Sequence, residues 1–223
     1  MIIQRDEFLK NLAQACGRPL RIKPAPMPKP VNDYPSTRFA DLTPDELEAM
    51  FIETASGMLA PTTKTVSADA ASTVLGVVER LGSPVLVSDH PALRALKVVE
   101  RLEKACGARL WDPADPSGTL QAVRAAETGV VYADYALADC GFMVLFSSPE
   151  QGRGASLLPR KTVFVVNKSR IVPRAARHAQ AGKRLPSCIN LIGGPSSTAD
   201  IELIKVVGVH GPTTAEYVIV EDL

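Results

Sequence analysis

The sequence has 223 residues, of which 46% are hydrophobic and 22% are charged, a composition typical of a globular protein with one sizeable core. Lys and Arg total 25 and Asp and Glu total 24, so the formal net charge of +1 provides no basic field that would attract nucleic acid. The apolar runs are shorter than the roughly 18 residues of a membrane-spanning helix. The N-terminus also lacks the basic start and apolar core of a signal peptide. We therefore expect a cytoplasmic protein without a nucleic-acid partner or a membrane span.

The cysteines are too far apart in the sequence for a metal-binding motif. They are Cys16, Cys106, Cys140 and Cys188, and none forms a CxxC pair. Such pairs are the usual signature of zinc sites and iron–sulfur clusters. The sequence shows no flavin fingerprint either. We therefore expect no metal and no cofactor, and we interpret the four residues as small buried hydrophobic side chains.

The first 40 residues differ in pattern from the rest of the chain. Residues 2–16 place apolar side chains near helical spacing, which predicts a short amphipathic helix. Residues 19–35 carry six prolines, which disfavour helix and sheet and predict an extended arm. That arm is either a disordered linker or a segment that crosses the domain surface or a second copy of the chain, which would make the protein a homo-oligomer. We divide the sequence into this N-terminal helix and arm, residues 1–40, and an α/β domain, residues 41–223.

Residues 41–133 alternate between helix and strand patterns. A helix begins at Thr43-Pro44-Asp45-Glu46, where an N-cap hydroxyl, a proline and an acidic residue occupy capping-box positions, and it continues to about Leu59. Parallel strands need helical crossovers, so the alternation that follows predicts a largely parallel sheet. The predicted strands are 63–66, 84–88, 108–111 and 130–133, and the predicted helices are 68–81, 91–105 and 117–127.

The pattern changes after Asp134. Apolar runs at 142–146 and 162–166 are joined by a loop instead of a long helix, which predicts an antiparallel or mixed section. Residues 173–181 are predicted to form a short basic helix, and residues 216–220 the last strand. The predicted fold class is therefore α/β: a Rossmann-like, mostly parallel sheet with helices on both faces and an added antiparallel section.

The stretch from Ile189 to Pro212 carries the strongest signal for a binding site. An apolar run at 189–192 breaks at Gly193-Gly194-Pro195, and a helix is predicted to start at Ser196 to Thr198. A second apolar run, 206–209, stops at 210–212. Two loops of small and polar residues thus follow two predicted buried strands. Because open α/β sheets bind ligands at the carboxyl ends of their strands, we expect one pocket there.

The chemistry expected of this pocket is anion binding. Free amides at the predicted helix N-terminus would bind a carboxylate or phosphate by donating hydrogen bonds to it. The alternative is a helix cap, since Ser197 and Asp200 also stand at capping-box spacing. His210 is the candidate catalytic residue, since an imidazole titrates near neutral pH; hydrogen bonding to a neighbouring backbone group is the alternative. Arg153, between two glycines, either supplies a guanidinium to the pocket or belongs to a surface turn. The candidate ligand-binding residues are Gly152, Arg153, Gly194, Ser196, Ser197, Thr198, Asp200, Gly208, His210 and Gly211.

The segment "GPSSTADIELIKVVGVHGP", residues 194–212, closely resembles the C-terminal signature of the LUD-domain family. Residues 133–141, "ADYALADCG", and 150–159, "EQGRGASLLP", are similar to two preceding blocks of that family. This chain departs from the family pattern at Asp139-Cys140, where the family usually has glutamate and threonine, and at Thr162, where it usually has histidine. The likeness covers about residues 40–220.

This resemblance implies a fold similar to that of the sugar-phosphate isomerases and coenzyme A transferases. It also implies a function in the bacterial oxidation of L-lactate to pyruvate, in which the chain would be a non-cluster subunit beside iron–sulfur partner proteins. The alternative is a stand-alone enzyme or ligand-binding protein for a small phosphorylated or coenzyme A-linked substrate, which rests on analogy of fold. The sequence leaves open whether the chain is catalytic by itself.

Overall fold

The computed structural model describes residues 4–20, 28–29, 31–174, 186–198, 204 and 206–223. The chain divides into two units, residues 1–33 and 34–223. In the first unit, helix α1 (Arg5–Ala15) confirms the predicted N-terminal helix. Residues 21–27 and 30 of the proline-rich arm lie outside the described residues. The second unit opens with a short helix, α2 (Tyr34–Thr37), that the proline pattern did not predict.

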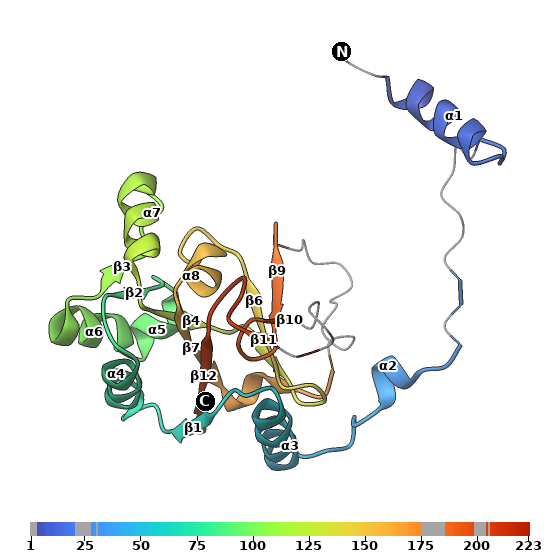
Figure 1. Cartoon of the computed structure of the whole chain (residues 1–223). Helices are drawn as coiled ribbons and strands as arrows, with labels where there is room; N and C mark the ends of the chain where they lie inside the picture. The colour runs from blue at the N-terminus through green and yellow to red at the C-terminus, as the bar shows by residue number, and fades with distance from the viewer. Residues whose placement is uncertain (1–3, 21–27, 30, 175–185, 199–203, 205) are drawn as a thin grey trace. The chain divides into compact units, whose positions relative to one another are not determined.

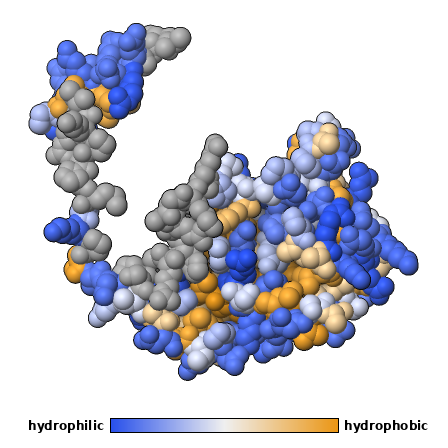
Figure 2. Space-filling view, turned by 180° about the vertical axis from the view of Figure 1, so that it is seen from behind, coloured by the Kyte–Doolittle hydropathy of each residue, from blue (hydrophilic) through white to orange (hydrophobic). Residues whose placement is uncertain are grey.

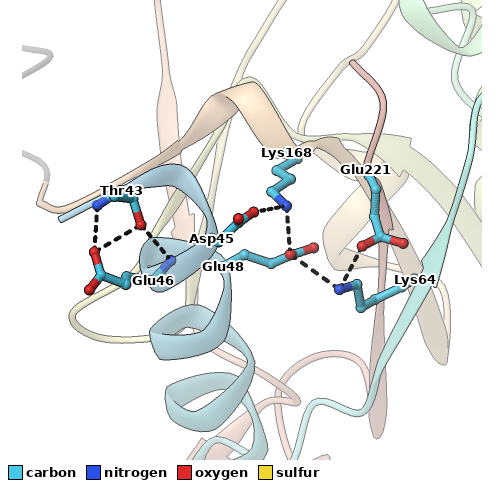
Figure 3. A network of polar contacts seen from close by, with 7 residues as sticks. All are labelled: Thr43, Asp45, Glu46, Glu48, Lys64, Lys168 and Glu221. Carbon is cyan, nitrogen blue, oxygen red and sulfur yellow. Dashed lines mark hydrogen bonds and ion pairs between the residues drawn. The ribbon is translucent and has the colours of Figure 1, made fainter.

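Helix α3 (Pro44–Gly57) begins at the capping box that the sequence predicted. The amide of Glu46 donates to Thr43 Oγ1 at 3.3 Å, and Glu46 Oε2 accepts from the amide of Thr43 at 2.8 Å (Figure 3). These bonds satisfy amide groups that a helix start leaves without partners. The hydrogen bond from the Thr43 backbone holds the pKa of the Glu46 carboxyl below its usual value.

A six-stranded parallel sheet forms the centre of the second unit, in the order β1-β12-β7-β4-β2-β3 (Figure 1). The predicted parallel sheet is therefore confirmed. The predicted helix 91–105 is two helices, because Lys97 adopts a left-handed conformation at φ 56° and interrupts it. The strands are β1 (Thr62–Thr65), β2 (Val85–Val87), β3 (Arg109–Leu110), β4 (Thr128–Tyr132), β7 (Lys161–Asn167) and β12 (Thr214–Val220), and the helices around them are α4 (Ala70–Leu81), α5 (Pro91–Ala95), α6 (Val98–Cys106), α7 (Pro116–Ala125) and α8 (Gly154–Leu157).

Two apolar cores lie on the two faces of this sheet. Helices α4, α5 and α6 supply buried Val, Leu and Ala side chains to one face, where they meet Val163 and Val218 of the central strands. On the other face, the ring of Tyr217 stacks on that of Phe51 from α3 at 5.7 Å and meets the edge of Phe164 at 5.6 Å. Tyr217 is fully buried. The alternation of inward-facing side chains along β7 and β12 thus gives both faces of the sheet a core.

A second, mixed sheet has the order β8-β5-β6-β9. Strand β6 runs antiparallel to both β5 and β9, as the predicted antiparallel section requires. The run at 162–166, however, is part of β7 in the parallel sheet, since its Val163–Val166 side chains are fully buried, as in a central parallel strand. Residues 175–185, most of the predicted basic helix, lie outside the described residues. The elements are β5 (Tyr135–Leu137), β6 (Phe142–Phe146), the 3-10 helix η1 (Lys168–Arg170), β8 (Ile171–Val172) and β9 (Ile189–Ile192).

The surface of the molecule is mixed in polarity. In the space-filling view, hydrophobic patches lie between hydrophilic ones on the visible face (Figure 2). Among the described residues, no helix has the length and apolar character needed to cross a membrane.

Candidate functional site

The strands around the predicted pocket differ from the expectation. Strand β9 joins the mixed sheet at its edge, and its Ile189 and Leu191 are 36% and 51% exposed, so it is not a buried strand of the parallel sheet. Ser197–Thr198 form a short strand, β10, which pairs antiparallel with β11 (Val206–Val207). The prediction that a helix starts at Ser197 is therefore wrong. Asp200, the predicted capping partner, lies outside the described residues.

The structure nevertheless brings the two predicted loops together. Residues 193–197 and 210–212 line one cavity of about 380 Å³. The cavity does not lie beyond the carboxyl ends of the parallel strands. Residues 210–213 lead into the start of β12, where the amide of Thr213 donates to the carbonyl of Arg160 at 2.7 Å. The expected location is thus wrong, because the loop at 210–213 enters the parallel sheet and the loop at 193–197 follows a strand of the mixed sheet. The rest of the cavity lining is Ser156, Leu157, Phe164, Leu191, Ile192 and Ala215.

Several backbone amides of these loops already have partners within the protein. The amide of Gly194 donates to the hydroxyl of Tyr217 at 2.9 Å, and the amide of Ser196 donates to the carbonyl of Pro212 at 2.8 Å. The amide of Gly208 donates to the carbonyl of Ser196 at 2.7 Å. These amides stabilise the loops instead of forming an anion cradle. Side chains such as those of Ser197 and His210, which are exposed and line the cavity, are better placed to contact a ligand.

The remaining predicted residues lie elsewhere. Arg153 is exposed and precedes α8, and it is not among the residues that line the cavity. Gly152 packs directly against the ring of Trp111, where a Cβ atom would clash. Thr198 belongs to β10, and Gly208 is in the turn after β11. The structure thus favours the surface-turn interpretation of residues 152–154.

A second group of polar side chains lies at the carboxyl ends of β2 and β4. The chain leaves β2 for β3 through α5 and α6 on one face, and it returns from β3 to β4 through α7, whose Val123 packs on the opposite face. Strands β3 and β4 therefore flank β2 with crossovers on opposite sides. This arrangement is a topological switch point, where open α/β sheets bind ligands.

His90 and Asp134 follow these two strand ends. The ring of His90 stacks on that of Tyr132, with centroids 4.7 Å apart, and His90 Nδ1 accepts from the amide of Ala92 at 3.2 Å. Burial lowers the pKa of His90, which the charges of Asp134 and Glu150 partly oppose. Asp134 Oδ2 accepts from the amide of Phe146 at 2.7 Å, and burial raises the pKa of its carboxyl.

The loop that follows β6 is fixed to this edge by Gln151. Its buried side chain accepts from Ser88 Oγ at 2.8 Å and from the amide of Tyr132 at 2.9 Å, and it donates to the carbonyl of Tyr132 at 2.8 Å. The sequence interpretation missed this group of residues. The available signal was the polar run Ser88-Asp89-His90, which directly follows an apolar strand and precedes a helix that starts at Pro91. The loop at 193 was singled out on the same kind of pattern, small and polar residues after an apolar run.

Both candidate sites lie in a segment that a protein-family model matches, since the model for the LUD domain covers residues 65–220. The chain belongs to the LUD-domain family. A relative called "Uncharacterized protein YkgG", from Escherichia coli (strain K12), is 47% identical over 98% of each chain. Proteins called "Lactate utilization protein C" are 35% identical in Geobacillus kaustophilus (strain HTA426), over 99% of this chain and 98% of theirs, and 34% identical in Shouchella clausii (strain KSM-K16), over 100% of both.

A solved structure shares the fold of this LUD-domain protein. The crystal structure of a DUF162 family protein from Deinococcus radiodurans superposes with a TM-score of 0.57, covering 80% of this chain and 99% of that one. At 20% sequence identity, this likeness concerns the fold alone. It agrees with the predicted α/β class.

Two positions where this chain departs from the expected LUD-domain pattern have internal partners. The carboxylate of Asp139 pairs with Arg174 at 3.1 Å, and the hydroxyl of Thr162 donates to the carbonyl of Ser156 at 3.1 Å. Burial raises the pKa of the Cys140 thiol to about 11, so this thiol stays protonated at neutral pH. The two contacts give Asp139 and Thr162 structural roles.

Proposed function

We propose that this chain acts in lactate utilisation, as a component of a system that oxidises L-lactate to pyruvate. The similarity to proteins named "Lactate utilization protein C" supports this proposal, because it covers 99% of this chain and 98% of the Geobacillus kaustophilus protein. Because the similarity extends over the full length of both chains, it supports a shared function better than a match over one segment would. In this system the protein works together with iron–sulfur partner proteins.

The cysteines support a division of labour in which the partners carry the clusters. Iron–sulfur clusters are held by Cys thiolates, usually four in one site. Cys16, Cys106, Cys140 and Cys188 are all free, and among the described residues no group of three or more His, Cys, Asp or Glu side chains is arranged to hold a metal ion.

Affinity purification from the native host tests this proposal. A tagged chain isolated from cells grown on L-lactate is expected to bring down iron–sulfur proteins, with iron in proportion to those partners. The same chain produced alone is expected to be colourless. A deletion strain should lose growth on L-lactate and keep growth on an unrelated carbon source. Purification of the chain without partners, together with normal growth of the deletion strain on L-lactate, would contradict the proposal.

The cavity formed by the loops 193–197 and 210–212 favours a second candidate function, the binding of a small phosphorylated or coenzyme A-linked ligand by the chain itself. Its volume of about 380 Å³ lies within the usual range of small-ligand pockets. In this proposal Ser197 and His210 contact the anionic group. Each contact is expected to contribute about 1 kcal/mol, or roughly fivefold in affinity.

Calorimetry with inorganic phosphate and with coenzyme A tests this second function. Ser197→Ala and His210→Ala are each expected to weaken binding about fivefold, the loss of one hydrogen bond. Arg153→Ala is the matched control, because Arg153 is exposed and does not line the cavity. Equal binding by the wild type and both loop variants, or no binding to the wild type, would exclude this function.

A further inference from the structure

Three side chains of different chemistry meet around the switch point at the ends of β2 and β4. They are His90 after β2, Asp134 after β4, and Arg170, the last residue of η1 after β7. Strands β2, β4 and β7 are parallel neighbours, so the residues that follow them emerge at one edge of the sheet. His90 stacks on Tyr132 and Arg170 lies over the ring of Tyr135, so both contact residues that flank Asp134. A hydrogen-bond donor, an acceptor and a cation are therefore grouped at one edge of the sheet.

Arg170 supplies the cation. Its guanidinium carbon lies 5.6 Å from the centre of the Tyr135 ring, a cation–π contact that orients the side chain. Arg170 is exposed, and it takes part in none of the ion pairs found among the described residues. A planar guanidinium in this state can bind a carboxylate through two parallel hydrogen bonds.

His90 supplies a directed donor. Its Nδ1 accepts from the amide of Ala92, so a neutral ring carries its proton on Nε2. Burial favours this neutral form, and the stacked ring of Tyr132 holds the imidazole in place. The Nε2–H group therefore remains to donate to a ligand oxygen.

Asp134 supplies the acceptor. Its Oδ2 accepts from the amide of Phe146 at 2.7 Å, and this bond positions the carboxyl group at the strand end. Asp134 and Glu150 both act electrostatically on His90. The two carboxylates repel a dianion such as a phosphate ester more strongly than a monoanion, and a monoanion can pair with Arg170.

We propose that His90, Asp134 and Arg170 form a binding site for a small 2-hydroxy or 2-oxo monocarboxylate. The ligand class rests on the proposed function in lactate utilisation, and the site deepens that function. Arg170 binds the carboxylate, His90 Nε2–H donates to the oxygen on C2, and Asp134 accepts from the hydroxyl group of a 2-hydroxy acid. The proposed site is separate from the loop cavity at the start of β12.

Calorimetry on the full chain with pyruvate, L-lactate and acetate tests this site. Arg170→Gln removes the cation and is expected to weaken binding of all three ligands at least tenfold. His90→Asn keeps a helix-capping acceptor but removes the Nε2 donor. It is expected to weaken binding of pyruvate about fivefold and to leave acetate, which has no oxygen on C2, unchanged. Arg153→Gln is the matched control, because Arg153 is an exposed arginine that lies outside this group of residues. Thermal unfolding of each variant checks that it is folded.

The outcomes separate this site from the broader proposal. Loss of pyruvate binding in Arg170→Gln, with the Arg153→Gln control like the wild type, supports the site. Unchanged binding in Arg170→Gln and His90→Asn, or no binding of pyruvate and L-lactate to the wild type at millimolar concentration, overturns it. Neither result depends on co-purification with iron–sulfur proteins or on growth on L-lactate, so the proposed function stands or fails independently.

Discussion

Replacing Gly141 by alanine is expected to lower the free energy of unfolding by roughly 2–5 kcal/mol. Gly141 has φ +69°, and a Cβ atom there would lie 2.5 Å from the amide nitrogen of Ala55 in α3. The left-handed conformation costs an alanine about 1–2 kcal/mol. Displacing backbone in a packed core costs about 1–3 kcal/mol more. Urea unfolding followed by circular dichroism measures the loss.

Gly107→Ala is the matched control for this prediction. Gly107 has φ +63°, but no heavy atom lies within 4 Å of the position of an added Cβ. This variant should show only the conformational cost of about 1–2 kcal/mol. If both variants lose the same amount of stability, the close contact between Gly141 and α3 contributes nothing, and the packing argument is wrong.

Replacing Glu48 by alanine is expected to cost about 3 kcal/mol, the lower end of the range for breaking a buried ion pair. The Glu48 side chain is 5% exposed, and Oε2 lies 3.2 Å from Lys64 Nζ and 3.0 Å from Lys168 Nζ. Figure 3 shows this carboxylate between the two lysines. Alanine would leave both cations without it. The cost is expected at the lower end of that range because the Lys64 side chain is 43% exposed and water can solvate it.

Asp45→Ala provides the control, because Asp45 also pairs with Lys168 but its side chain is 86% exposed. Its effect should be much smaller. The hydrogen bonds to Asp45 and Glu48 raise the pKa of Lys168 above its usual 10.5. The network therefore contributes fully below about pH 10.5 and is lost as the pH rises through the folded-state pKa. Equal losses for Asp45→Ala and Glu48→Ala at pH 7 would show that burial of the carboxylate is unimportant.

Local signals predicted most elements of the fold. The capping residues at Thr43 and the apolar runs of β2, β4 and β7 depend on nearby residues, so their patterns are visible in the sequence. The partners of a strand are not local. The run at 189–192 reads as an apolar strand, but its side chains alternate between more and less exposed positions in an edge strand of the mixed sheet.

The same limit applies to the sites. The composition of residues 193–212 correctly indicated loops that approach each other, but it did not show that Gly194 and Ser196 donate to Tyr217 and Pro212. Those partners lie in other parts of the chain. The group around His90 was missed because His90, Asp134 and Arg170 are far apart in the sequence, and the order of strands brings them together.

The position of β12 affects the order of events during synthesis. This last strand along the chain, residues 214–220, lies between β1 and β7 in the sheet. While the chain emerges from the ribosome, β1 and β7 therefore each keep an open hydrogen-bonding edge until residues 214–220 have emerged. Open edges of this kind pair with those of other chains. Incomplete chains that end before residue 214 should therefore aggregate, and a chaperone that shields the edges would protect the nascent protein.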